Sequence, residues 1–124
     1  IIMEVFNCDK VYLDKDNYGG YGVFAKDDIK KGDIVEVGLM IRLVNVDGNE
    51  NPHLFTWSDD RKVWAIGSGL LAYYNHSDNP NIKKIGDLEN DSMKIIALKD
   101  VSKGDELLGT YFSQKWRKCF ISLS

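Results

Sequence analysis

Apolar residues occur along this chain in short runs, separated by clusters of glycine, asparagine, aspartate and serine. Short runs of apolar and β-branched residues with such boundaries predict β-strands. The runs that predict strands cover residues 3–14 (one or two strands), 21–25, 34–46, 53–57, 63–66, 82–85, 93–98 and 105–112. We therefore expect a mainly β fold, in which 82–85 and 93–98 form a hairpin around a loop at 86–92.

Helical patterns are few. The sequence predicts a turn or two of helix over residues 70–75 and a second short helix over 113–121. No linker or low-complexity segment divides the chain, so residues 1–124 are expected to form a single domain. That length is sufficient to bury a core without metals or disulfides.

Charge and cysteine usage narrow the possible functions. A net charge of -3 disfavours nucleic acid as the main ligand and is compatible with a basic peptide partner. Cys8 and Cys119 lie near opposite ends without zinc-ligand spacing, so neither a metal site nor a disulfide framework is expected. No long apolar run and no signal peptide are present, which predicts an intracellular protein with no membrane partner.

The most polar segment is residues 73–81 (YYNHSDNPN), which follows a short apolar run. Asparagine, serine and aspartate side chains compete with the backbone for hydrogen bonds, so this segment resists regular structure. Asn75 and His76 offer amide and imidazole groups suited to reading a purine edge. A capped helix end followed by an Asx turn explains the same residues equally well.

Residues 20–25 (GYGVFA) match the spacing of a dinucleotide fingerprint. That fingerprint must open a helix, and here a strand-turn-strand pattern follows, which excludes it. Two interpretations are left, a plain turn or a place where a ligand lies against bare backbone.

A six-residue pattern occurs twice, as DIKKGD at 28–33 and DVSKGD at 100–105. Each copy carries an apolar anchor and a glycine suited to a positive φ angle. We interpret the pair as a repeated structural turn, because a solenoid needs at least three copies.

The sequence does not indicate a cysteine or serine nucleophile. No spacing pairs a cysteine with His53 or His76, and both cysteines are interpreted as unreactive. Ser77 adjoins His76, but adjacent residues do not face each other and no nucleophile elbow is present.

Strand alternation in the last predicted strand places Leu107, Gly109 and Tyr111 on one face. Gly109 is expected to leave a small open space beside the Tyr111 hydroxyl. Taken alone, such a tyrosine is more often part of a core.

In their order and spacing, the GYGVFA segment, the KGD turn at 31–33, the NHSDNPN segment at 75–81 and GDELLGTY at 104–111 resemble a SET domain. This family comprises β-rich protein lysine methyltransferases that use S-adenosylmethionine. The resemblance covers about residues 10–116 and implies several small sheets, few short helices and a C-terminal pseudoknot that threads the NHS segment. The chain looks like the minimal stand-alone form found in large DNA viruses and some bacteria.

The resemblance also implies site residues. These are Gly20, Tyr21, Gly22, Asn75 and His76 for the cofactor, Tyr111 for catalysis, and His53, Gly109 and Trp116 for the substrate channel. The substrate implied is a lysine-containing basic protein, with histone tails leading because this chain is acidic. A nuclear location follows if the substrate is a histone, and a cytoplasmic one otherwise.

Some features depart from the family pattern. The cysteine-rich zinc module that closes the channel in many members is missing, so the Lys115-Trp116 tail or a second subunit in a homodimer is expected to close it. His53 and Lys115 stand where aromatic residues are usual. Two alternatives to the enzyme are a SET fold that binds a peptide or cofactor without turnover, and a purely structural β domain.

Overall fold

The computed structural model describes residues 7–110 except 50, 52 and 59. Several residues or ranges named above lie outside this part of the chain: 1–6, Tyr111, Lys115, Trp116, Cys119 and the predicted helix 113–121.

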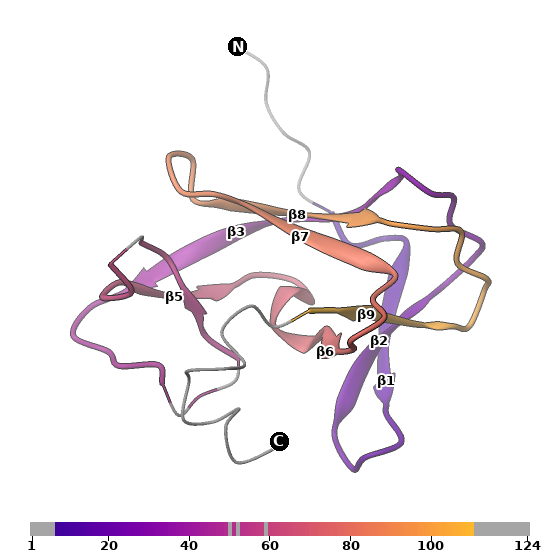
Figure 1. Cartoon of the computed structure of the whole chain (residues 1–124), viewed down its shortest axis with the longest axis horizontal. Coiled ribbons are helices and arrows are strands. Elements are labelled where there is room, and N and C mark those ends of the chain that lie inside the picture. The colour runs from indigo at the N-terminus through magenta and orange to yellow at the C-terminus, as the bar shows by residue number, and fades with distance from the viewer. Residues whose placement is uncertain (1–6, 50, 52, 59, 111–124) are drawn as a thin grey trace.

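The described residues form two sheets of mostly antiparallel strands with almost no helix, which confirms the mainly β prediction (Figure 1). The strands are β1 (Val11–Lys15), β2 (Tyr21–Ala25), β3 (Ile34–Leu43), β4 (Phe55–Thr56), β5 (Trp64–Gly67), β6 (Asn75–His76), β7 (Ile82–Asp87), β8 (Ser92–Ala97) and β9 (Glu106–Gly109). One 3-10 helix, η1 (Leu71–Tyr73), precedes β6. One sheet has the strand order β1-β2-β9-β6 and the other β4-β5-β3-β8-β7.

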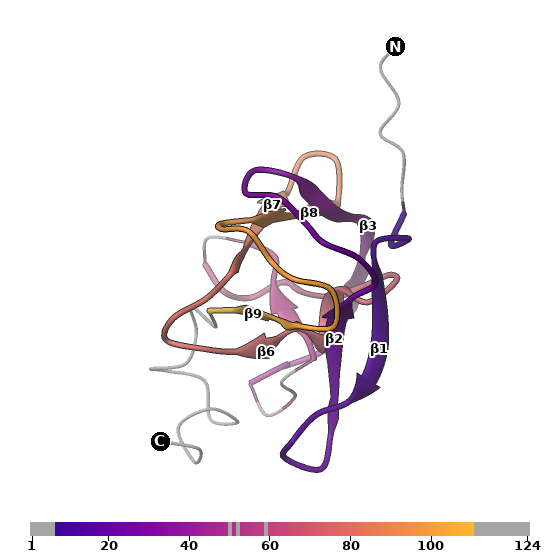
Figure 2. The same ribbon diagram turned by 90° about the vertical axis from the view of Figure 1, so that its right-hand side faces the viewer.

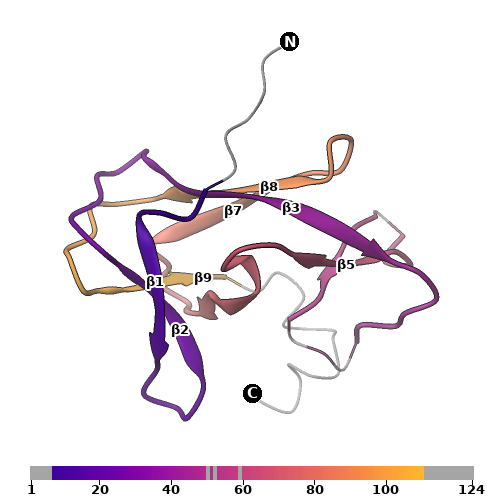
Figure 3. The same cartoon turned by 180° about the vertical axis from the view of Figure 1, so that it is seen from behind.

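The two sheets enclose the hydrophobic core between them. Figure 2 shows β3, β7 and β8 above the layer that contains β9, β6, β2 and β1, and Figure 3 shows the β1–β2 hairpin extending from that lower layer. Alternation within β8 places Met93, Ile95 and Ala97 inside the core. Leu107 on β9 and Val23 on β2 bury their side chains from the opposite layer.

Strands β6 and β9 are far apart in the sequence but lie side by side, and we call the place where they pair the β6–β9 crossing. These strands run parallel, with Asn75 opposite Leu108 and His76 opposite Gly109. The loop after β6 then holds β9 through Asn81, whose side-chain amide donates to Glu106 O at 2.9 Å and whose Oδ1 accepts from Leu108 N at 2.8 Å. The chain therefore closes around β9, as the implied pseudoknot requires.

The prediction of a helix over 70–75 was wrong in its second half. The helix is a single 3-10 turn, Leu71–Tyr73, and Tyr74 already has the extended angles φ -70 and ψ 117. Asn75 continues into β6 because its backbone pairs with Leu108, a partner that local sequence does not reveal.

Several predicted strands are shorter than expected. β3 ends at Leu43 because Asn45 adopts a left-handed φ of 56. β4 is confined to Phe55–Thr56. The predicted hairpin is confirmed, but β7 runs on to Asp87 and β8 begins at Ser92, so its loop is tighter than 86–92.

The repeated turn is confirmed as a structural device. Ile29 and Val101 form an antiparallel bridge with each other, with both N–H to O distances at 2.8 Å. Gly32 and Gly104 adopt nearly equal positive φ angles of 89 and 85. Each turn also receives a backbone N–H from the other on its first aspartate, Lys31 N to Asp100 Oδ1 at 2.8 Å and Lys103 N to Asp28 Oδ1 at 2.9 Å.

Candidate active site

The side-chain amide of Asn75 lies among three acceptors from three other segments. Its Nδ2 is 2.8 Å from Glu106 Oε2, 3.0 Å from Asp16 Oδ2 and 3.2 Å from Tyr21 O. An amide nitrogen carries two hydrogens, so the acceptors outnumber the donors. The cluster is therefore suited to a further donor, and an ammonium group supplies three.

Asp16 is held ionised at the end of the β1–β2 turn. Its Oδ1 accepts hydrogen bonds from Tyr18 N at 2.8 Å and Gly20 N at 2.9 Å. These backbone donors, helped by the Asn75 amide, hold the pKa of Asp16 below its usual value. The carboxylate is thus fixed beside the Asn75 amide by the turn that the glycines create.

Gly22 is required by the side chains that pass over it. A Cβ at this position would overlap Glu106 Oε2 and would lie 3.0 Å from Asn75 Nδ2. At Gly20 an added Cβ would meet Asp16 Oδ2 at an ordinary 3.4 Å. The structure therefore brings Tyr21 and Gly22 of the glycine segment against Asn75, and Gly22 is the position at which an added Cβ would have to displace Glu106. The role of these residues in holding a cofactor stays a prediction.

His76 is fixed at both its backbone and its ring. Its backbone pairs with Gly109, and its Nε2 lies 3.0 Å from Asp78 Oδ1. Downstream, Ser77 N donates to Gly109 O at 2.8 Å, while Ser77 Oγ accepts from Asn79 N at 3.0 Å. The polar segment thus combines local turns with strand pairing, and the backbone of His76 lies beside β9.

The expected open space beside Gly109 is filled, so this prediction was wrong. Leu107 and Gly109 do share the buried face of β9. However, a Cβ on Gly109 would lie 2.9 Å from Ile82 Cδ1 and 3.3 Å from Lys84 Cε. Two side chains of β7 occupy the volume that glycine vacates.

Lys84 is a half-buried residue beside Gly109 that sequence reasoning missed. Its Nζ lies 5.3 Å from the centroid of the Phe55 ring, and burial lowers its pKa to about 8. The available signal was the alternation of Ile82, Lys84 and Gly86, which places all three on one face of β7. Two consecutive lysines are typical of a solvent-exposed strand, so the sequence offered little reason to place Lys84 on the inner face.

His53 lies against the 3-10 helix before β6. Its Nδ1 is 3.1 Å from Ala72 O, and its ring centroid is 5.6 Å from that of Tyr73. This places His53 close to the chain that leads into Asn75. Its role in a substrate channel, like that of Trp116, stays a prediction.

The buried carboxylate of Glu36 holds the segment that leads into Asn75. Leu70 N donates to Glu36 Oε2 at 2.8 Å, and the Tyr74 hydroxyl donates to Oε1 at 2.7 Å. Burial raises the pKa of Glu36, although both hydrogen bonds oppose this. Gly69 has φ 57 and leaves no room for a Cβ next to this carboxylate. Sequence offered a weak signal here, namely one acidic residue inside an otherwise apolar strand.

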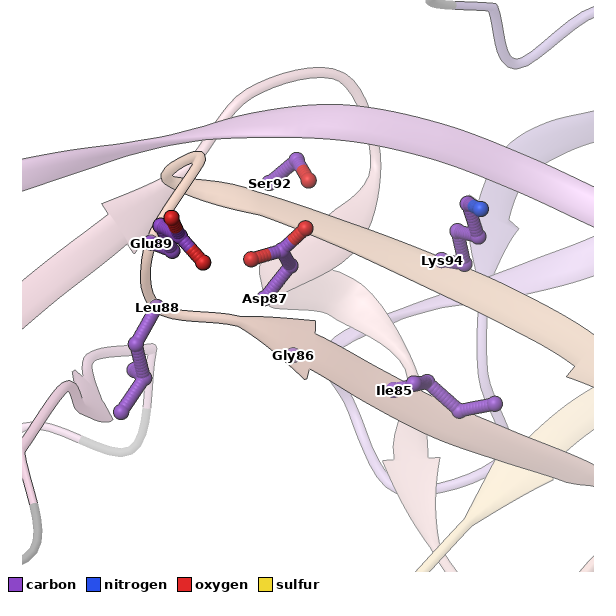
Figure 4. A pocket seen from close by; sticks show the side chains of 7 residues that line it. All are labelled: Ile85, Gly86, Asp87, Leu88, Glu89, Ser92 and Lys94. Atoms are coloured by element: carbon purple, nitrogen blue, oxygen red, sulfur yellow. The ribbon is translucent and has the colours of Figure 1, made fainter. Parts of the chain in front are cut away.

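A separate pocket lies at the tip of the β7–β8 hairpin (Figure 4). Asp87, Glu89 and Ser92 gather at one end, and Lys94 and Ile85 lie farther along the strands. The Ser92 hydroxyl is buried without a hydrogen-bond partner. None of the predicted site residues lines this pocket, so the β6–β9 crossing is the stronger candidate.

Residues 7–110, apart from the three omitted positions, contain no group of histidine, cysteine and acidic residues able to hold a metal ion. Within the same residues, no helix has the length and hydropathy to span a membrane.

The fold and the β6–β9 pairing together define a small β protein in which β9 lies between β2 and β6 and is also held by Asn81. Residues 20–112 match the family model of the SET domain, so the chain belongs to the SET-domain family. It is 33% identical over 111 residues to histone-lysine N-methyltransferase EZH2 of Chaetomium thermophilum, covering 74% of this chain.

Solved structures agree with this assignment. Plasmodium falciparum PFL0690c is 32% identical with a TM-score of 0.66, and the alignment covers 83% of this chain and 97% of that one. A Chaetomium thermophilum Polycomb Repressive Complex 2 chain, in an autoinhibited conformation bound to S-adenosylmethionine, is 25% identical with a TM-score of 0.67, covering 84% and 15%. The chain spans only 7% of the length of its EZH2 relative.

Proposed function

We propose that this chain is an S-adenosylmethionine-dependent protein lysine N-methyltransferase. The observation that carries the proposal is the meeting of Gly22, Asn75 and Glu106 at the β6–β9 crossing. Family membership supports it, since the EZH2 relative carries this activity in its name.

The residues present fit the proposed cofactor. Asp16, Glu106 and Tyr21 O provide more acceptors than the Asn75 amide can satisfy, which suits the α-ammonium of a methionine moiety. Gly22 leaves bare backbone at this place, and the His76 backbone lies close by for an adenine edge. When bound, the cofactor would supply an electrophilic methyl group on a sulfonium.

The protein's own task is then to present a neutral amine. A lysine with an ordinary pKa near 10.4 needs about 4.6 kcal/mol to lose its proton at pH 7. Burial between the two sheets lowers that cost by desolvating the ammonium, as it does for Lys84. Tyr111, two residues beyond Gly109, would orient the amine through its hydroxyl, and most of the acceleration would come from proximity and alignment.

Histone tails are the substrate that we propose. The relative's name specifies a histone lysine, and a net charge of -3 suits a basic peptide. If so, the protein acts in the nucleus, with Lys115-Trp116 or a second subunit completing the channel past His53.

The experiment is transfer of labelled methyl from S-adenosylmethionine to core histones and to a mixed cell lysate, with Tyr111→Phe alongside. We expect the variant to lose most turnover while its cofactor affinity stays nearly unchanged. Label in lysate alone would exclude histones but keep the chemistry. Cofactor binding without any transfer would favour a SET-fold binding module instead.

A further inference from the structure

Lys84 is a half-buried residue on the inner face of β7. It pairs across the hairpin with Ile95, a fully buried residue of β8, so both side chains leave their strands on the inner face. Ile82 is on the same face and is buried. The Lys84 side chain therefore starts on the face of β7 that packs toward the other sheet, although the residue as a whole is only half-buried.

From β7 this side chain reaches across to β9. Its Cε lies 3.3 Å from the position that a Gly109 Cβ would occupy. Gly109 is the strand partner of His76, and Ser77 N donates to its carbonyl oxygen. The Lys84 side chain thus lies beside Gly109, whose backbone pairs with His76, one of the residues proposed to hold the cofactor.

Desolvation favours the neutral form of this amine and lowers the pKa of Lys84 to about 8. The Phe55 ring, 5.3 Å from Nζ, acts in the opposite direction, because a ring face attracts the charged ammonium. At pH 7 roughly one Lys84 in ten is neutral, whereas an ordinary lysine is neutral in fewer than one in a thousand molecules.

We propose that Lys84 is an internal methyl acceptor, methylated by the chain that carries it. This inference rests on the proposed function. The lone pair of neutral Nζ forms the new N–C bond, the C–S bond of the sulfonium donor breaks, and its electron pair stays on sulfur as a thioether. The product is a methylated ammonium, which then loses one proton to solvent.

Lys83 provides a matched control. It is adjacent in sequence but exposed on the outer face of β7. A methyltransferase that labels accessible lysines of its own chain would modify Lys83, whereas an internal acceptor at the crossing selects Lys84.

The test incubates wild type, Lys84→Arg and Lys83→Arg with labelled S-adenosylmethionine, in parallel with core histones, followed by peptide mapping. We expect methyl on Lys84, none on Lys83, loss in Lys84→Arg only, and a rate per molecule that is independent of protein concentration. Histone label without Lys84 label would overturn the inference and leave the proposed function intact. Label that rises with protein concentration would overturn the internal step. No label on any substrate would overturn both.

A second readout is independent of turnover. Lysine labelled with ¹³C at Cε reports the Lys84 pKa by NMR, with the signal assigned by its loss in Lys84→Arg. We expect a cofactor analogue with an ammonium in place of the sulfonium to lower this pKa by about one unit or more through like-charge repulsion. Neutral S-adenosylhomocysteine should lower it far less. Equal pKa values with both molecules bound would place Lys84 away from the transfer point and overturn the inference.

Discussion

The hydroxyl of Tyr74 donates a 2.7 Å hydrogen bond to Oε1 of Glu36, and each residue is only 1% exposed. Tyr74 immediately precedes Asn75, while Glu36 lies in β3 of the other sheet. The contact therefore fixes the start of β6 relative to the five-stranded sheet. A carboxylate buried in this way is stable only while its hydrogen bonds are intact.

Tyr74→Phe should lower the free energy of unfolding by about 1–3 kcal/mol, because it leaves a buried carboxylate oxygen without its donor. Urea denaturation at pH 7 measures this loss. Tyr18→Phe is the matched control, since Tyr18 is 92% exposed and should change stability little. Equal stability of the two variants would show that the hydrogen bond to Glu36 has no net effect.

Glu36 should make stability depend on pH in the direction opposite to that of an ordinary surface acid. Burial raises its folded-state pKa, so the folded chain holds an extra proton above the unfolded value near 4.5. This contribution is complete below that value and is lost as pH rises through the raised pKa. Glu36→Gln, which cannot ionise, should therefore gain stability relative to wild type from pH 4 to pH 8. A constant difference across this range would contradict a raised pKa.

Gly22→Ala should weaken cofactor binding at least tenfold. The new Cβ would displace Glu106 Oε2 and crowd Asn75 Nδ2, the acceptor and the donor of one hydrogen bond in the cluster around Asn75. Lys83→Ala is the control, because Lys83 is exposed on β7 and is not among the proposed binding residues. Calorimetric titration with S-adenosylhomocysteine compares the two variants. If both bind as wild type does, the cluster does not hold the cofactor.

Lys84→Met should raise the free energy of unfolding by about 1–2 kcal/mol at pH 7, because it removes the desolvation of an ammonium. The folded pKa near 8 lies below the unfolded value of 10.5, so between them the unfolded chain holds more protons and wild-type stability rises with pH. The advantage of the variant should thus shrink from pH 8 to pH 10.5. Lys83→Met should show no such trend, and a parallel trend would argue against burial as the cause.

Local patterns were sufficient to predict most of the fold. The alternation in β8 and the two DxxKGD turns are local features, and the structure bears them out. Distant partners determine the parts that were missed. Asn75 is a strand residue because of Leu108, and the half-buried Lys84 can lie against β9 because Gly109 leaves room for it. Neither relationship can be read from a window of neighbouring residues.

The candidate site was predictable to a similar degree. Motif order pointed to Gly22, Asn75 and His76, and the structure places the first two in contact across β9. Asp16 and Glu106 were not expected, because carboxylates in turns and at strand starts are common. Their significance depends on the Asn75 amide that they share.

The parallel pairing of β6 with β9 has a consequence for the newly made chain. Synthesis releases the glycine segment and the polar segment well before Glu106–Gly109 leaves the ribosome. Until then the side chains of Asn81 and Asn75 both lack their hydrogen-bond partner Glu106, so the cluster around Asn75 cannot assemble. Closing this long-range contact is also entropically slow. The nascent protein should consequently be unable to bind cofactor until its last described strand has threaded into place.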